Sequence, residues 1–202
     1  MKVKVPESIA DINLDQYQRF AGLPNDLTKT KLNYEKLNIF CGIDYKDAFR
    51  IPQNEIDSLV KMIDESLSKP NEFQKFFNIG DTKFGFHPNI NDMGGGEYGD
   101  LMDYNDGVDN YHRLMAILFR PVTSEDGMGN YTIAAYNGTD TWCEQMKQMP
   151  LNIVNGALVF FFNLSRELRI YIQKYSAEKE LQKATKQQTS GINGVGMPVT
   201  VK

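Results

Sequence analysis

The sequence predicts a mainly helical α+β protein: a compact helical body, a small β-hairpin and a long C-terminal helix. Three observations carry this prediction. Apolar residues recur at spacings of three and four in several segments, which is the helical period. Aromatic residues flank Gly80-Asp81, which is typical of a β-hairpin. Pro150 opens a long segment that predicts a helix from about Leu151 to about Gln187.

The N-terminal third carries the clearest helical spacing. Residues 2–6 (KVKVP) alternate as a strand does until the proline. Helices are then expected within residues 13–23, where Asn13 is a suitable N-cap, and within residues 27–43, where Gly42 ends the pattern. A third helix is expected within residues 51–70, between two prolines.

In the middle of the chain the spacing of apolar residues changes from the helical period to the alternation of a strand. The aromatic segment predicts a β-hairpin near residues 73–86, followed by helices near 94–104 and 106–119, the second stopped by Pro121. Residues 122–139 then predict a glycine-rich loop with a short strand at 131–135, and residues 139–149 a short helix.

The expected C-terminal helix is apolar almost all round in its first half and polar in its second. We therefore expect a body at residues 1–175 and, at 176–202, a polar helix extension with a Gly-rich arm. The end of that arm, MPVTV, could add to the edge of a partner's sheet. The candidate partner-binding residues are Lys179, Leu181, Lys183, Lys186, Met197, Val199 and Val201.

Composition narrows the classes of function. The 202 residues carry a net charge of -4, which argues against direct nucleic-acid binding, because phosphate contacts normally need a basic excess. The N-terminus resembles no signal peptide, and the longest apolar run, at residues 156–162, is far shorter than the about 20 residues of a membrane span. Cys41 and Cys143 form no CxxC pair and fit a reducing compartment.

The stretch MGGGEYGDLMDY, residues 93–104, most resembles a ligand site. A phosphate loop is excluded because Glu97 and Tyr98 follow the glycines, where a lysine and then a serine or threonine are needed, and an acid in that place would repel phosphate. An EF-hand loop is excluded because its spacing and its closing glutamate are missing. Glu97, Asp100 and Asp103 remain weak candidates for a divalent metal, but acids at helix starts explain the pattern more simply, with Asp106 and Asp109 opening the next helix.

The remaining histidines and cysteines match no known catalytic or metal-binding motif. His87 and His112 lie far apart and, with two scattered cysteines, show no zinc spacing. A Cys143–His112 nucleophile pair has no supporting motif, so a buried thiol and a hydrogen-bonded histidine are favoured. Arg120 is expected to satisfy the last carbonyls of the helix before Pro121. No enzymatic activity and no cofactor are expected.

Several phrases, taken in order, are similar to a group of small proteins encoded in the structural-gene clusters of tailed bacteriophages, including those that infect Bacteroidetes. They cover roughly residues 1–175. The phrases are INLDQYQRF, LNIFCGID, MGGGEYGDLMDY, NYHRLMAILFRPV and MPLNIVNGALVFFFNLSRELRIYI. Proteins of this group are often placed among tail-morphogenesis factors such as tail assembly chaperones. The resemblance implies no catalytic residue.

The resemblance implies a non-enzymatic morphogenesis protein that acts through protein–protein contacts in the host cytoplasm. Its expected partners are tape-measure, tail, neck or capsid proteins, and a homo-oligomer is also allowed. A structural or cargo component of the mature virion is the alternative. A further alternative, from a different class, is a metal-binding enzyme that uses the acidic stretch 97–109. The morphogenesis hypothesis predicts loss of partner binding when residues 176–202 are deleted.

Overall fold

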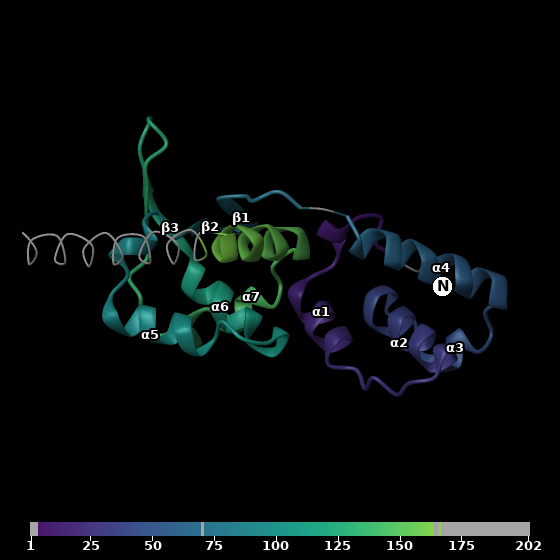
Figure 1. The fold of residues 1–202 in the computed structure, drawn as a ribbon. Helices are drawn as coiled ribbons and strands as arrows, with labels where there is room; N and C mark the ends of the chain where they lie inside the picture. The colour runs from purple at the N-terminus through teal and green to yellow at the C-terminus, as the bar shows by residue number, and fades with distance from the viewer. Residues whose placement is uncertain (1–3, 70, 164–165, 167–202) are drawn as a thin grey trace, which may run out of the picture. The chain divides into compact units, whose positions relative to one another are not determined.

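A computed structural model describes residues 4–69, 71–163 and 166 of the chain (Figure 1). The chain divides into two units, Met1–Leu158 and Val159–Lys202, of which the first contains nearly all the described residues. The first unit combines helices with a four-stranded antiparallel sheet, so the predicted α+β class is confirmed. The expected boundary at residues 175 and 176 lies outside the described residues.

Helices dominate the N-terminal part. They are η1 (Ile9–Asp11), α1 (Leu14–Ala21), α2 (Lys29–Cys41), α3 (Tyr45–Ala48) and α4 (Gln53–Leu67). Asn13 caps α1 in a reciprocal box with Gln16, in which each side chain accepts from the other residue's backbone N–H. Gly42 ends α2 with φ 66°, a left-handed conformation that favours glycine. The expected strand at residues 2–6 is absent from its described part, residues 4–6.

Backbone hydrogen bonds tie α1 to the C-terminal part of the same unit. The Leu14 N–H donates to the Met149 carbonyl at 3.0 Å, and the Leu151 N–H donates to the Ile12 carbonyl at 2.8 Å. Leu14, Met149 and Leu151 are fully buried. The start of α1 is therefore held by the segment that precedes the last described helix.

The sheet has the order β1-β2-β3-β4, from β1 (Phe76–Ile79), β2 (Thr82–Phe86), β3 (Phe119–Glu125) and β4 (Tyr131–Ile133). The predicted hairpin is confirmed: β1 and β2 pair in register around Gly80, which has φ 56°. The expected loop at residues 122–139 is partly wrong, because β3 continues through Pro121 as far as Glu125 and pairs with both β2 and β4. β4 is two residues shorter than expected.

Aromatic rings fill the space around the first three strands. Phe77 lies 5.1 Å from Phe119 and 5.4 Å from Phe84, measured between ring centroids. On β2, a Cβ at Gly85 would lie 2.9 Å from a ring carbon of Tyr131, so a larger residue there would have to displace that ring. The Tyr131 hydroxyl donates to the Phe86 carbonyl at 2.6 Å.

Short helices lie between β2 and β3 in the chain and after β4. Those between β2 and β3 are η2 (Ile90–Asp92), α5 (Gly95–Asp103), η3 (Val108–Asn110) and α6 (Tyr111–Leu118), and those after β4 are η4 (Thr139–Thr141) and α7 (Cys143–Met146). The helix expected at 106–119 begins only at Tyr111, because Gly107 has φ 78° and a separate 3-10 turn follows it. The helix expected at 139–149 is divided between η4 and α7.

The last described helix occupies residues 151–163, of which 151–158 belong to the first unit. Gly156 is buried there, and a Cβ on it would lie 2.4 Å from the backbone oxygen of Glu72. The expected continuation to Gln187 lies outside the described residues apart from Arg166. Among the helices that are described, none combines the length and the apolar character that crossing a membrane requires.

Candidate functional sites

Three ionisable side chains meet in the protein interior between α5 and the sheet. Glu97 comes from the first turn of α5, Arg120 from the start of β3, and His87 from just after β2. Their residues are 6%, 4% and 9% exposed respectively. Glu97 Oε1 lies 2.7 Å from Arg120 Nη1 and 3.3 Å from His87 Nε2. We call these residues the buried ion cluster.

The Glu97–Arg120 contact is short but is not aligned as a hydrogen bond. Glu97 Oε1 and the Nε and Nη1 atoms of Arg120 make no hydrogen bond with any described residue. The guanidinium also lies over the ring of Tyr136, 5.5 Å from its centroid. Charge attraction therefore holds the pair more than hydrogen-bond geometry does.

Burial shifts the pKa of His87, a member of the cluster, and of Tyr136 beside it. Burial lowers the pKa of His87, and the positive charge of Arg120 adds to this, whereas Glu97 opposes it. The Tyr136 hydroxyl donates to Asp100, and burial together with that bond raises the pKa of Tyr136. The ion pair between Glu97 and Arg120 links α5 to β3, and His87, whose neutral form is favoured, lies beside it.

The acidic residues predicted as weak metal candidates lie on one helix but in different surroundings. Glu97 is buried with Arg120, Asp100 accepts from Tyr136, and Asp103 is exposed at the end of α5. The helix-start interpretation holds for the position of Glu97 but misses its burial. The expectation for Arg120 is wrong: it lies in β3 and pairs with Glu97, because the helix before it ends at Leu118.

A second cluster lies where α6 and α7 pack together. His112, Cys143 and Glu144 each offer one ligand atom, and these atoms lie within 4.8 Å of one another. Cys143 is buried, His112 half-buried and Glu144 exposed. The Cys143–His112 pairing, which has no sequence motif, is thus brought together by tertiary structure.

The imidazole of His112 is contacted by a side chain from α1. The amide nitrogen of Gln18, on α1, lies 3.1 Å from His112 Nδ1 and donates to the Val108 carbonyl at 2.7 Å. Burial lowers the pKa of His112, and the nearby cations Lys147 and Arg113 add to this. These contacts favour a neutral, oriented ring.

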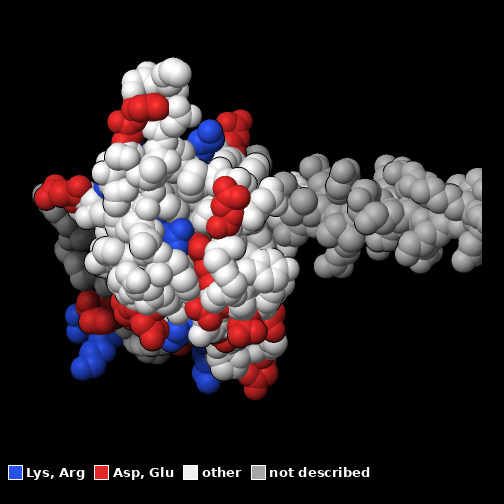
Figure 2. All heavy atoms as spheres, turned by 90° about the vertical axis from the view of Figure 1, so that its left-hand side faces the viewer, with Lys and Arg blue, Asp and Glu red and all other residues white. Residues whose placement is uncertain are grey.

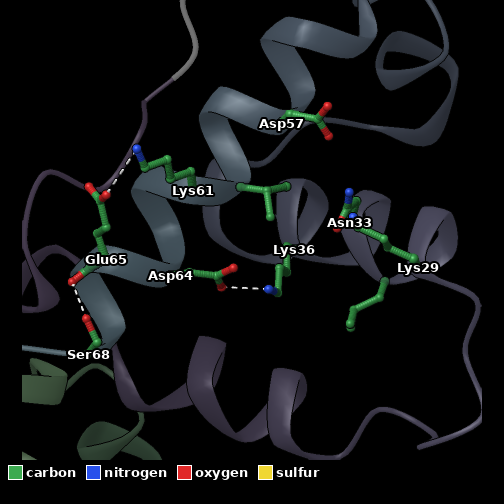
Figure 3. A pocket seen from close by; sticks show the side chains of 10 residues that line it. Lys29, Asn33, Lys36, Asp57, Lys61, Asp64, Glu65 and Ser68 are labelled. Carbon is green, nitrogen blue, oxygen red and sulfur yellow. Dashed lines mark hydrogen bonds and ion pairs between the residues drawn. The ribbon is translucent and has the colours of Figure 1, made fainter.

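A groove of about 660 Å³ lies between α2 and α4 (Figure 3). Lys36, only 9% exposed, pairs there with Asp64 at 2.6 Å, and Lys61 pairs with Glu65 at 3.7 Å. Three lysines and three carboxylates line it in all, the other two being Lys29 and Asp57. The groove therefore has no excess of either charge to select a charged ligand.

The β3–β4 hairpin projects from the sheet in Figure 1 and stands at the top of the face drawn in Figure 2. The Asp126 carboxylate accepts from the Met128 N–H at 2.9 Å, and from the N–H and the side-chain amide of Asn130 at 2.8 and 2.7 Å. Gly129 completes the turn with φ 84°. Met128 at the tip is 84% exposed, the most exposed of the described large apolar residues.

The C-terminal residues predicted to bind partners, from Lys179 to Val201, lie outside the described residues. Sequence reasoning missed the hairpin tip, although the turn residues of DGMGN between two β-prone runs were a usable signal. Comparisons of the chain with protein-family models, curated proteins and solved structures found no match.

Proposed function

We propose that the chain is a non-enzymatic protein of bacteriophage morphogenesis that acts through protein–protein contacts in the host cytoplasm. Tail or virion assembly is the favoured process, with tape-measure, tail, neck or capsid proteins as partners. The proposal rests on the ordered resemblance described above and on one structural observation. That observation is the β3–β4 hairpin, whose turn is hydrogen-bonded to Asp126 and which carries an exposed methionine at its tip.

The hairpin combines order with apolar exposure. Asp126 holds the turn through three hydrogen bonds, so the tip loses little conformational freedom when it binds. Lys83 on β2 pairs with Glu125 at 2.5 Å and braces the base of the turn. A methionine presented in this way can adapt its flexible side chain to an irregular apolar pocket. These properties favour a binding arm.

A second apolar feature supports the same role. Tyr98 and Met102 lie one helical turn apart on α5 and are 54% and 42% exposed. The hairpin and α5 both belong to the side of the molecule drawn in Figure 2, where uncharged surface is interrupted by carboxylates and by a smaller number of lysine and arginine side chains. Apolar anchors with acidic neighbours suit a partner surface that is apolar and basic.

Two variants of the proposal differ in the fate of the chain. A tail-assembly chaperone would leave before the particle is complete, whereas a structural or cargo component would stay in the virion. The metal-enzyme alternative at residues 97–109 is disfavoured, because Arg120 already neutralises Glu97 in the interior.

Mass spectrometry of purified particles and of infected-cell lysate separates the variants. Peptides of the chain in particles at a fixed copy ratio would identify a virion component. Abundance in lysate without incorporation would identify a transient assembly factor. If the chain neither enters particles nor co-purifies with any structural protein during infection, the morphogenesis proposal is wrong.

The hairpin's part in binding is tested with Met128→Asp. We expect it to abolish co-purification with the structural partner, because a charge at the tip cannot enter an apolar pocket. Met62→Asp is the matched control, since Met62 is 44% exposed but lies on α4. Unchanged circular dichroism for both variants would show that folding is retained. Equal recovery of partner with both variants would contradict binding through the hairpin.

A further inference from the structure

We propose that His112, Cys143 and Glu144 form a binding site for a divalent transition-metal ion of the zinc class. Their ligand atoms lie within 4.8 Å of one another, and they come from two helices that pack together, α6 and α7. This site is independent of the assembly role proposed above. It also departs from the expectation that the chain binds no metal.

The ligand chemistry selects the ion. An imidazole nitrogen, a thiolate sulfur and a carboxylate oxygen are the three donors that Zn²⁺ accepts, whereas Mg²⁺ and Ca²⁺ prefer oxygen alone. Three protein ligands would leave a fourth position for water or for a group from a partner. The buried Cys143 would supply the sulfur, and the exposed Glu144 would close the site from the solvent side.

The distances are compatible with closure around an ion. With metal–ligand bonds of about 2.0–2.3 Å, the ligand atoms of a tetrahedral site lie about 3.3–3.7 Å apart. The three ligand atoms in the structure lie no further than 4.8 Å from one another. A movement of about 1 Å is therefore enough, and the exposed side chain of Glu144 can make it by a change of rotamer.

Neighbouring residues hold the two helices and the imidazole in place. Arg113 donates to Thr139 Oγ1 at 3.2 Å and pairs with Asp140 at 2.9 Å, which joins α6 to the turn before α7. The side-chain amide nitrogen of Gln18 lies 3.1 Å from His112 Nδ1 and helps to orient the imidazole ring. The site is therefore supported from α1 as well as from η4.

One cation competes with the metal. Lys147 Nζ lies 2.8 and 2.9 Å from the two carboxylate oxygens of Glu144. The side chain of Glu144 in that pair is 73% exposed and that of Lys147 is 33% exposed, so water screens the attraction and a divalent ion can displace the lysine. The competition gives the site a distinctive property: Lys147→Met should tighten metal binding several-fold, although it removes no ligand.

Cobalt titration of the full chain tests the proposal, because Co²⁺ bound to a thiolate gives a charge-transfer absorption in the near ultraviolet. We expect this band in the native protein and in Cys41→Ser, and its loss in Cys143→Ser. Cys41 is the matched control, since it is also buried, and burial raises its pKa to about 11. Absence of the band from the native protein, or its persistence in Cys143→Ser, would overturn the proposal.

Glu144→Gln keeps the test valid if substitution of the buried cysteine prevents folding. Glu144 is exposed, so this variant should fold normally while Zn²⁺ affinity falls by about tenfold or more. In the native protein, free Zn²⁺ at a hundred times its Kd should raise Tm by roughly 5–10 °C. Equal Zn²⁺ affinity in native protein, Glu144→Gln and Lys147→Met would refute the assigned ligand set.

Discussion

Replacing Glu97 by alanine would leave Arg120 as a buried charge without its carboxylate. Arg120 is 4% exposed, and its Nη1 atom lies 2.7 Å from Glu97 Oε1. Breaking a buried pair in this way costs about 3–5 kcal/mol. We expect the lower end, about 3 kcal/mol, because Arg120 keeps its contact with the Tyr136 ring, and such contacts contribute about 0.5–2 kcal/mol.

Urea unfolding followed by circular dichroism measures this loss. A drop in midpoint at constant m-value would report stability alone, and Tm should fall by roughly 6–12 °C. Asp103→Ala is the matched control, because it removes an exposed carboxylate from the same helix and should change stability by less than about 0.5 kcal/mol.

A double variant separates charge from packing. Glu97→Met with Arg120→Met removes both charges and should be more stable than Glu97→Ala, since an apolar pair replaces an uncompensated ion. The reasoning is refuted if Glu97→Ala is as stable as Asp103→Ala. It is also refuted if the double variant recovers nothing relative to the single one.

Three further predictions concern the close packing of Gly156 against the backbone of Glu72, the dependence of stability on pH, and the hairpin turn. Gly156→Ala should destabilise by about 1–2 kcal/mol in urea, because its Cβ would lie 2.4 Å from a backbone oxygen and overpacking outweighs the gain in helix propensity. Gly99→Ala, with open space around its Cβ, should stabilise by up to about 1 kcal/mol. The lowered pKa of His87 means that the unfolded chain binds its proton first, so stability should fall as pH drops below about 6.5, and less steeply in His87→Gln. Asp126→Ala should speed amide hydrogen exchange at the hairpin tip, because the backbone N–H groups there lose their acceptor.

Features set by local chemistry could be predicted from the sequence. Asn13 three residues before Gln16 forms the expected cap, and glycine at 42 and 80 takes the positive φ that ends a helix or turns a hairpin. β3 could not be predicted in this way. Its Pro121 resembles a chain stop, and its pairing with β2 is a long-range contact that leaves no periodic signal.

The candidate sites depend even more on long-range contacts. Glu97 stands in a polar helix start, and only the fold brings Arg120 and His87 to it. The position of Arg120 after a continuous apolar run was the one local sign of its burial. His112 and Cys143 lie on different helices with no shared spacing, so their meeting could be seen only in three dimensions.

The buried ion cluster and the β3–β4 hairpin are joined by one strand, β3. Arg120 lies at the start of β3, and the same strand runs outward to Glu125 beside the turn. A substitution at Glu97 could therefore impair partner binding by unfolding the strand that carries the tip. Met128→Asp acts at the exposed tip and leaves that strand's buried contacts intact. Loss of binding in Met128→Asp at unchanged Tm would thus locate the contact at the hairpin tip. Loss only in Glu97→Ala would show that binding needs the folded body but not the methionine at the tip.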